Sequence, residues 1–327
     1  MATIKDVAAR SGISIKTVSR VLNGADTVRP NIRAKVEQAI RELQYRPALA
    51  ARQLVTGRSF IIVLLVPDTA HWYYSMMVQA MAQACRSVGW HLVVETFDRQ
   101  ALEEDEHWSI GLSCDADAVI VLPPWSDHPR MLPSLERLGL PAVRIAGRVP
   151  GYGMLLKVHD RDVARQLVEH LIAQGHQRIA MIAPPSDQLS SEERHLGYRD
   201  AMAAAGLDVP DAFVFRSTML FESGAEAFRQ LMSLPVRPTA FFAVNDATAL
   251  GAMTTALRLG FRVPQDLAFA GFDNSPESRY AFPSLTTADQ PFEQIARQAV
   301  LMAIGRDEEQ VETPRRIILR ESSQSAL

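Results

Sequence analysis

From Phe60 onward, short apolar runs rich in Val, Ile and Phe alternate with longer segments of helical periodicity. The apolar runs are predicted strands: Phe60–Val66, His91–Val94, Ala118–Val121, Ala142–Ile145, Ile179–Ile182, Ala240–Val244 and Leu267–Phe272. The clearest predicted helices are Ser75–Val88, Arg161–Gln174, Arg194–Ala204, Ser223–Met232, Ala247–Leu259 and Phe292–Ile304. This alternation is typical of an α/β fold, in which helices cover parallel sheets. Two breaks in the pattern favour two similar subdomains.

The first 60 residues differ from the rest in charge. They hold 11 Lys and Arg against 4 Asp and Glu, a net charge of +7. Subtracting these from the chain totals of 34 and 37 leaves 23 basic and 33 acidic residues, a net charge of -10. The overall charge of -3 argues against a nucleic-acid-binding protein, but the distribution indicates a small basic head on an acidic body.

The head has the spacing of three helices. Thr3-Ile4-Lys5-Asp6 resembles a capping box and starts a helix that runs to about Arg10. After a tight turn at Gly12, Ser14 caps a second helix, whose apolar stripe is Val18, Val21 and Leu22. Asn23-Gly24 ends this helix, and a third is expected from about Pro30 to Leu43. Two helices joined by a short glycine turn are the layout of a helix-turn-helix.

Three segments carry a resemblance to a known family: Ala2–Ala8, Thr17–Asn23 and Tyr45-Arg46-Pro47. In these segments the chain resembles the LacI/GalR family of bacterial transcription regulators. The resemblance implies an N-terminal all-α helix-turn-helix head, a hinge helix, and a body with the fold of periplasmic binding proteins. The alternative is a helical bundle with an accidental basic face.

In that family the second helix enters the major groove of DNA. Ile15, Lys16 and Arg20 then become candidates for reading bases, because Arg suits guanine and Ile15 can touch a thymine methyl. The resemblance also implies phosphate or mixed contacts for Thr3, Thr17, Ser19 and Asn23. For Lys16 and Arg20 taken singly, the alternative is a solvated charge. The head departs from many relatives at Arg29, where they have a Ser or Thr cap.

Residues 47–59 join head and body. Their composition favours a helix that ends at Gly57, but the segment is too short to be stable alone. By resemblance it is a hinge helix that orders on DNA, with Leu54 as a wedge between base pairs and Ala51 allowing close approach to the minor groove. A plain tether is the alternative.

The expected domains are therefore a head of residues 1–46, a hinge of 47–59 and an effector-binding and dimerisation body of 60–327. Within the body, the resemblance implies an N-subdomain of about 60–157 plus 289–305. The C-subdomain would be about 158–288 plus 306–327.

Ligands of open α/β sheets bind beyond the carboxyl ends of the strands. Asn245-Asp246 and Asp273 follow predicted strands, and Arg194 is expected to open a helix. By resemblance these residues hydrogen-bond the effector, and aromatic walls come from Tyr73, Tyr74 and Phe221.

Each of these assignments has a structural alternative: Asp246 capping the following helix, Asp273 holding a turn, or the two tyrosines packing in the core. The chain also departs from relatives at Trp72, Ala146 and His159-Asp160, so the identity of the effector does not transfer.

Enzyme classes find no support in the sequence. Pro67-Asp68-Thr69 follows the first predicted strand where a dinucleotide-binding glycine motif would stand, and neither a Walker motif nor a Gly-x-Ser-x-Gly elbow occurs. Cys85 and Cys114 are expected to be buried free thiols in apolar helical surroundings, and no metal or cofactor is expected. No apolar run is long enough to cross a membrane, and the N-terminus lacks a signal-peptide core.

The sequence is thus interpreted as that of a cytoplasmic, homodimeric repressor of a carbohydrate utilisation operon. It would bind palindromic operator DNA and respond to a sugar or sugar derivative bound between the subdomains. An activator of the same family and a periplasmic sugar-binding protein are the alternatives. No heptads occur near the C-terminus, so no tetramerising helix is expected.

Overall fold

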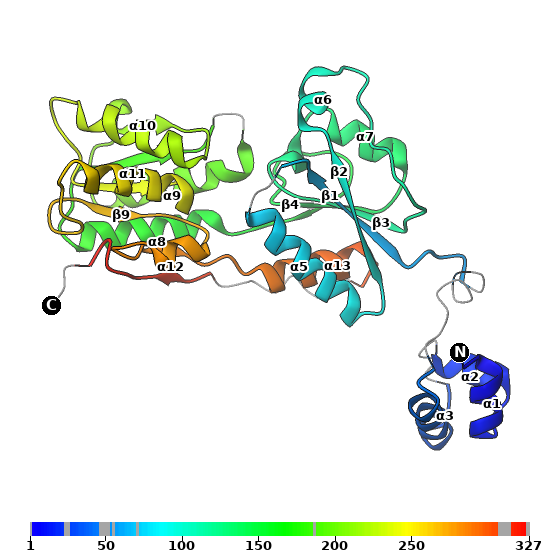
Figure 1. Ribbon diagram of the computed structural model, residues 1–327. Coiled ribbons are helices and arrows are strands. Elements are labelled where there is room, and N and C mark those ends of the chain that lie inside the picture. The colour runs from blue at the N-terminus through cyan, green and yellow to red at the C-terminus, as the bar shows by residue number, and fades with distance from the viewer. Residues whose placement is uncertain are drawn as a thin grey trace. The chain divides into compact units, whose positions relative to one another are not determined.

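The structure is a computed structural model that describes residues 2–22, 27–45, 53, 56–69, 72–185, 188–306 and 315–324. The chain divides into two compact units, a head of Met1–Phe60 and a body of Ile61–Leu327. Both are drawn in Figure 1. The predicted site residues Asn23, Ala51 and Leu54 lie outside the described residues.

The head contains the three predicted helices, α1 (Ile4–Ser11), α2 (Ile15–Leu22) and α3 (Pro30–Glu42). The capping box at the start of α1 is confirmed, because the Thr3 hydroxyl accepts from the Asp6 amide and the Asp6 carboxylate accepts from the Thr3 amide. Gly12 ends α1 with a φ of 68°, which favours glycine. The small core between the helices contains Val7, Val18, Val21, Val28, Val36 and Ala39.

The first sheet of the body is parallel, with the strand order β2-β1-β3-β4-β5. Its strands are β1 (Ile61–Pro67), β2 (His91–Phe97), β3 (Ala118–Val121), β4 (Ala142–Ile145) and β5 (Met154–Leu156). Its helices are α5 (Trp72–Ser87), α6 (Arg99–Glu104) and α7 (Met131–Leu138), with a 3-10 turn η1 (Trp125–Asp127). Helix α5 begins before the predicted Ser75, so Tyr73 and Tyr74 lie in its first turn.

The second sheet repeats this arrangement with the parallel order β7-β6-β8-β9. Its strands are β6 (Ile179–Ala183), β7 (Val214–Arg216), β8 (Ala240–Ala243) and β9 (Ala268–Ala270). Its helices are α8 (Asp160–Ala173), α9 (Leu189–Ala204), α10 (Phe221–Met232), α11 (Asp246–Arg258) and α12 (Pro276–Tyr280), with a 3-10 turn η2 (Asp211–Phe213). Fully buried Phe242 and Phe269 lie in the two core layers on either side of this sheet.

The last part of the chain contributes to both halves of the body (Figure 1). Helix α13 (Phe292–Ala303) packs against α5 beside the first sheet. The antiparallel pair β10 (Thr287–Ala288) and β11 (Ile317–Ile318) packs against α8 beside the second sheet. Segments far apart in the sequence therefore complete each half.

Two sequence-based expectations and one alternative need correction. Helix α9 begins at Leu189, so Arg194 lies in its second turn and does not open it. Cys114 lies in a loop before β3 and is half-buried, whereas Cys85 is buried in α5 as expected; both are free thiols. The alternative interpretation of Asp246, that it caps the following helix, is excluded, because the side chain of Asn245 forms the cap of α11. Among the described residues, no helix is both long and apolar enough to cross a membrane.

Candidate functional site

Helix α2 presents one face of the head to solvent and buries the other. Val18 and Val21 are buried in the head core, as predicted. Ile15 is 46% exposed, and Lys16 and Arg20 are also exposed. The long side chains suited to base contact therefore stand on the surface of a helix whose opposite face fixes its orientation.

The shorter side chains that are predicted to contact DNA lie beside this face. Thr17 and Ser19 are half-buried, while Thr3 is exposed at the start of α1, where its hydroxyl serves the capping box. The Arg20 guanidinium donates a hydrogen bond to the Thr27 hydroxyl at 2.9 Å. Arg29 precedes α3 with no side-chain cap, as its departure from the family pattern suggested.

The described part of the hinge agrees with a helical end. The amide of Gly57 donates to the Gln53 carbonyl at 2.8 Å, and Gly57 has a φ of 65°. The Gln53 side chain also donates to the carbonyl of Ser59.

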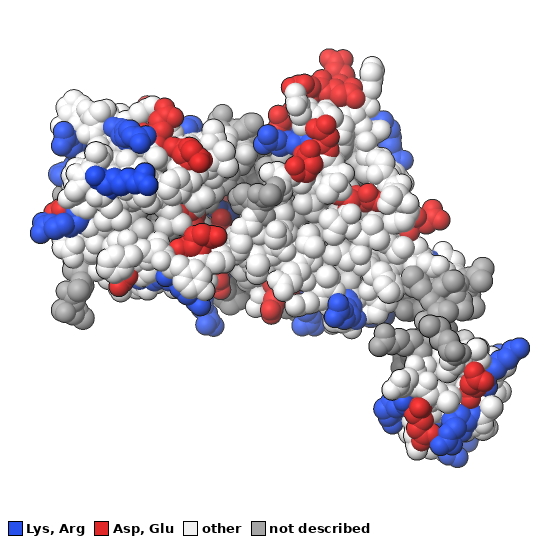
Figure 2. Space-filling view, viewed as in Figure 1, with Lys and Arg blue, Asp and Glu red and all other residues white. Residues whose placement is uncertain are grey.

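The space-filling view shows how charge is distributed on one face of the molecule. Lys and Arg side chains are prominent on the head in Figure 2. On the body, acidic side chains gather over α6 and the turn that follows it, where Glu103, Glu104, Asp105 and Glu106 are exposed. Elsewhere on this face the body carries both basic and acidic side chains.

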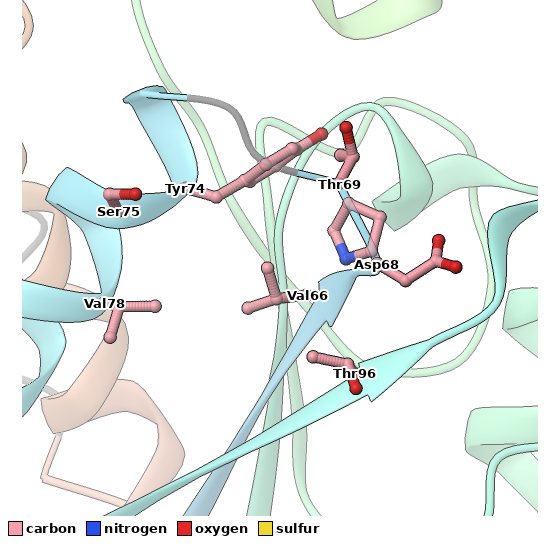
Figure 3. Close-up of a pocket in the computed structure, with 8 residues that line it drawn as sticks. Val66, Asp68, Thr69, Tyr74, Ser75, Val78 and Thr96 are labelled. Carbon is pink, nitrogen blue, oxygen red and sulfur yellow. The ribbon is translucent and has the colours of Figure 1, made fainter.

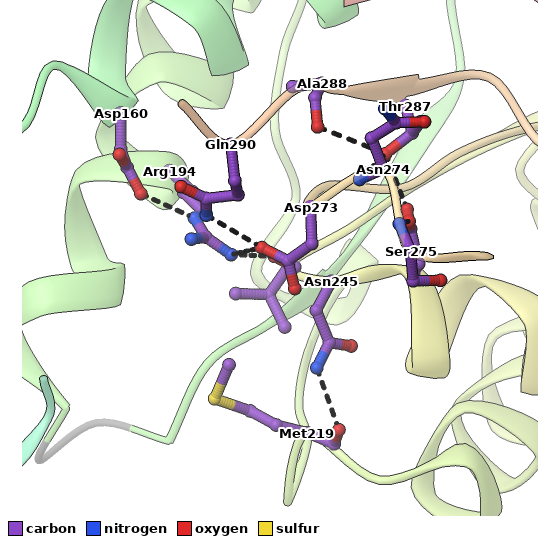
Figure 4. Close-up of polar contacts among 12 residues, drawn as sticks. Asp160, Arg194, Met219, Asn245, Asp273, Asn274, Ser275, Thr287, Ala288 and Gln290 are labelled. Atoms are coloured by element: carbon purple, nitrogen blue, oxygen red, sulfur yellow. Dashed lines mark hydrogen bonds and ion pairs between the residues drawn. The ribbon is translucent and has the colours of Figure 1, made fainter. Parts of the chain in front are cut away.

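Four charged residues with buried side chains form one group at the carboxyl edge of the second sheet. We call Asp160, Arg194, Asp273 and Arg315 the charged cluster; part of it is drawn in Figure 4. Arg194 Nε lies 2.8 Å from Asp160 Oδ2, and Arg194 Nη1 lies 3.4 Å from Asp273 Oδ1. Arg315 Nη1 lies 2.5 Å from Asp160 Oδ1. The cluster thus joins α8, α9, the end of β9 and the C-terminal segment.

Arg194 is held in the charged cluster by several kinds of contact. Arg194 Nη1 donates to the carbonyl of Val244 at 2.6 Å, and its guanidinium lies 3.8 Å from the centre of the Phe272 ring. Burial alone would raise the pKa of Asp160, but Arg315 and Arg194 outweigh it and hold that pKa below its usual range. Burial alone would lower the pKa of Arg194, but the nearby charges of Asp160 and Asp273 outweigh burial and raise this pKa above its usual value. The cluster therefore favours the charged forms of Asp160 and Arg194.

Asp273 is held in an unusual backbone conformation. Its φ is 113° and that of Asn274 is 53°, a region that non-glycine residues rarely adopt. The amide of Asp273 donates to Ala288, and the side chain of Gln290 donates to Asp273 Oδ1 at 2.9 Å. Such strain persists where surrounding contacts impose it, and it often marks functional sites.

Asn245 and Asp246 have structural partners close to the cluster. The Asn245 side-chain oxygen accepts from the amide and hydroxyl of Thr248, and its nitrogen donates to the carbonyl of Met219. The Asp246 carboxylate accepts from the Ser275 amide and the Thr287 hydroxyl. These contacts fix the loop that carries Asp273.

The aromatic candidates divide into two groups. Tyr73 lies close enough to the charged cluster to interact electrostatically with Arg315, Asp160 and Asp273, and its ring centre is 5.5 Å from that of Phe292. Tyr74 donates to the carbonyl of Pro123 and accepts from the Trp125 indole. Phe221 is 42% exposed at the start of α10 and has no described contact with the cluster.

Tyr74 also lines a cavity of about 510 Å³ at the carboxyl edge of the first sheet. Figure 3 shows Val66, Asp68, Thr69 and Tyr74 around it, with Ser75, Val78 and Thr96. The Pro67-Asp68-Thr69 segment therefore forms a wall of a cavity where the first strand ends.

The sequence interpretation missed several residues that lie in or beside the cluster. Asp160 was noted only as a departure from the family pattern, and Arg315, Gln290 and Phe292 were not singled out. Asp160 and Arg194 are 34 positions apart, and no local pattern links them. Gln290 lies two residues after β10, in the segment that leads to α13 in the other half of the body, and no sequence motif marks it.

Comparison with known proteins gives matches over nearly the whole chain. The family model described as "Bacterial regulatory proteins, lacI family" matches residues 3–48. A model described as "Periplasmic binding protein-like domain" matches residues 168–323.

Curated relatives include the HTH-type transcriptional regulator CelR of Thermobifida fusca, 33% identical over 97% of this chain and 95% of its own length. The HTH-type transcriptional repressor CytR of Escherichia coli (strain K12) is 32% identical over 93% of this chain and 89% of its own. The ribose operon repressor of the same strain is 32% identical over 94% and 93% of the two chains.

Solved structures of two regulators also resemble the fold. A CelR–cellobiose complex has a TM-score of 0.68 at 30% identity, covering 98% of this chain and 100% of the other. The lac repressor dimer bound to operator and the anti-inducer ONPF has a TM-score of 0.70 at 27% identity, covering 99% of each chain.

Proposed function

We propose that this chain, which belongs to the LacI family of bacterial regulatory proteins, represses a carbohydrate utilisation operon under the control of a small-molecule effector. The relatives that place it in this family are transcription regulators, and the family is not enzymatic. Support for repression and for a sugar comes from the names of relatives: two are repressors, and CelR was solved with cellobiose.

The head would bind operator DNA through α2. Lys16 and Arg20 would contact base edges in the major groove, with Ile15 against a thymine methyl. Thr3, Thr17, Ser19 and Asn23 would contact phosphates and so fix the register of the helix on the duplex. The hinge would then place Leu54 in the minor groove, with Ala51 allowing close approach.

A homodimer would place two such helices in successive major grooves of a palindromic operator. The lac repressor dimer bound to operator is a structural relative that supports this arrangement. Tyr280 and Phe282, which are 80% and 87% exposed on the body, offer an apolar surface for a second copy. We place the protein in the cytoplasm, where the DNA of a bacterium lies.

The effector would bind in the body, between an N-subdomain of about 60–157 plus 289–305 and a C-subdomain of about 158–288 plus 306–327. Arg194 and Asp273 would hydrogen-bond its hydroxyls, since a guanidinium donates and a carboxylate accepts. Asn245 and Asp246 would shape this wall through their contacts with Met219 and Ser275. Tyr73, Tyr74 and Phe221 would supply aromatic surface against a sugar ring.

Control of DNA binding requires that the effector favour one arrangement of the body. By linkage, an effector that changes operator affinity must itself bind the operator-bound protein with an affinity changed by the same factor.

The observation that carries the proposal is the position of Lys16 and Arg20 on the exposed face of a helix whose other face is buried in a helix-turn-helix.

The test is selection of operator fragments from genomic DNA by the purified protein, followed by release with a panel of sugars, glycosides and nucleosides. We expect enriched fragments to share a palindrome and to lie near genes of carbohydrate metabolism. We also expect binding to weaken as salt rises, because neutralising phosphates releases counterions. Enrichment of no sequence would refute the proposal.

A further inference from the structure

We infer that Asp160 makes the effector site selective for uncharged ligands, by occupying Arg194 with a buried carboxylate and leaving no surplus positive charge for an anion. The inference rests on the proposed function, because it takes Arg194 to face the effector. It adds the chemical class of that effector: a neutral sugar, glycoside or nucleoside, and not a sugar phosphate or sugar acid.

The first support is the charge balance of the buried cluster. Arg194 and Arg315 carry two positive charges, and Asp160 and Asp273 carry two negative charges. Their side chains are between 3% and 10% exposed, so solvent screens their charges poorly. Burying one more negative charge here would leave it without a counter-ion, which is strongly unfavourable.

The second support is the geometry of Arg194. A guanidinium binds phosphate or carboxylate best with two parallel N–H groups. In this structure Nε faces Asp160 at 2.8 Å, and Nη1 faces Val244 and Asp273. An incoming anion would have to displace Asp160 to gain the edge formed by Nε and its neighbour. A hydroxyl group needs no such displacement, because it can accept from one N–H and donate to a carboxylate.

The third support is the sign of the surrounding charge. The next carboxylate is Asp246, whose pKa is raised to about 7 by burial and, second, by the negative charge of Asp273. Arg320 points elsewhere, donating to Ser278, Leu285 and Asn274. The segments of the body outside the described residues, 70–71, 186–187, 307–314 and 325–327, contain neither Lys nor Arg. The sequence therefore provides no spare cation in those segments for a phosphate.

Asp160→Asn is the direct test, because it removes one negative charge and keeps the shape of the side chain. The probe is inorganic phosphate, added at constant ionic strength against chloride, with binding measured by calorimetry and by thermal shift. We expect saturable phosphate binding by Asp160→Asn that is at least tenfold tighter than by the unchanged protein. Equal affinities in the two proteins would overturn the inference.

Two further variants keep the test decisive. The double variant Asp160→Asn with Arg315→Met restores the balance of charge and should lose the gained phosphate affinity. If it binds phosphate as tightly as Asp160→Asn does, the anion lies elsewhere and the inference fails. Should Asp160→Asn not fold, Asp273→Asn leaves the same surplus charge and should also bind phosphate more tightly than the unchanged protein, by a smaller factor because Asp160 still occupies the Nε edge of Arg194.

The unchanged protein gives an answer without any variant. Tight phosphate binding by it would contradict the balanced cluster directly. Operator binding is measured separately, so a protein that binds no operator refutes the proposed function, while phosphate affinity reports only on the cluster.

Discussion

The carboxylate of Asp246 accepts a hydrogen bond from the amide of Ser275 at 2.7 Å, across 29 positions of sequence. A second bond, from the Thr287 hydroxyl, reaches it at 2.6 Å. Asp246 is only 1% exposed, and it ties the start of α11 to the loop after β9 and to β10. It is therefore a buried acid that holds the strained segment at Asp273 in place.

Asp246 should make the protein less stable as pH rises through weakly acidic values. Burial and the charge of Asp273 raise its pKa to about 7 in the folded protein, above the ordinary Asp value of 3.8. Between these values the folded state holds a proton that the unfolded state has released, so the free energy of unfolding falls as pH rises. The loss is at most about 4 kcal/mol and is complete above about pH 7.

Chemical denaturation at several pH values from 5 to 8 checks this slope. Other groups also titrate, so the useful quantity is the difference between the unchanged protein and Asp246→Asn. We expect the variant to lack this part of the fall in stability. Identical pH profiles for the two proteins would show that Asp246 does not titrate in this range.

Gly251 should tolerate no side chain, because α10 and α11 cross at this point. A Cβ atom on Gly251 would lie 2.0 Å from the carbonyl oxygen of Phe221. We expect Gly251→Ala to lower the free energy of unfolding of the body by about 1–3 kcal/mol or more. Gly111→Ala is the matched control, since nothing lies within 4 Å of its Cβ position; comparable losses in both variants would argue against the close approach.

Arg20→Ala should lower operator affinity by about 1–3 kcal/mol and relax the choice of base at one position. The control is Arg41→Ala, an exposed cation on α3 with the same change in charge. We expect Arg41→Ala to retain sequence preference. Fluorescence anisotropy with operator and scrambled duplexes distinguishes the two, and unchanged operator binding by Arg20→Ala would remove α2 from the base contacts.

An ion pair between Arg148 and Glu193 joins the two halves of the body. Arg148, after β4, lies 3.0 Å from Glu193 on α9, and the Arg148 amide is held by Asp127. Both side chains are partly exposed, so the pair contributes only about 0.2–1 kcal/mol. We expect Glu193→Gln to change effector affinity by up to about fivefold at low salt and by less at high salt. A large effect on effector affinity that persists at high salt would mean that Glu193 acts on effector binding by more than this ion pair.

Much of the fold followed from local patterns. Apolar runs predicted the central strands, and the capping box of Thr3 and Asp6 correctly located the first helix of the head. Edge strands such as β5 and β7 were missed, because they are short and only partly buried. The early start of α9 was missed as well, since a polar first turn hides it from a search for apolar periodicity.

The site was less predictable than the fold. Arg194 and Asp273 stand beside recognisable motifs, and the structure brings them within 3.4 Å of each other. Asp160 and Arg315 come from distant segments, and only the three-dimensional arrangement shows that they neutralise one another. Asn245 and Asp246 were expected to face a ligand, yet their polar atoms are largely engaged by the protein. The spacing of residues along the sequence does not tell whether a polar group faces a ligand or another part of the protein.

Effector control of DNA binding is tested by measuring operator affinity as a function of effector concentration, in the unchanged protein and in Asp273→Asn. We expect the effector to change the operator affinity of the unchanged protein by about 5- to 150-fold. We expect Asp273→Asn to bind operator equally well but no longer to respond to effector. A normal effector response in Asp273→Asn, or operator affinity that no effector alters in the unchanged protein, would contradict the proposed control.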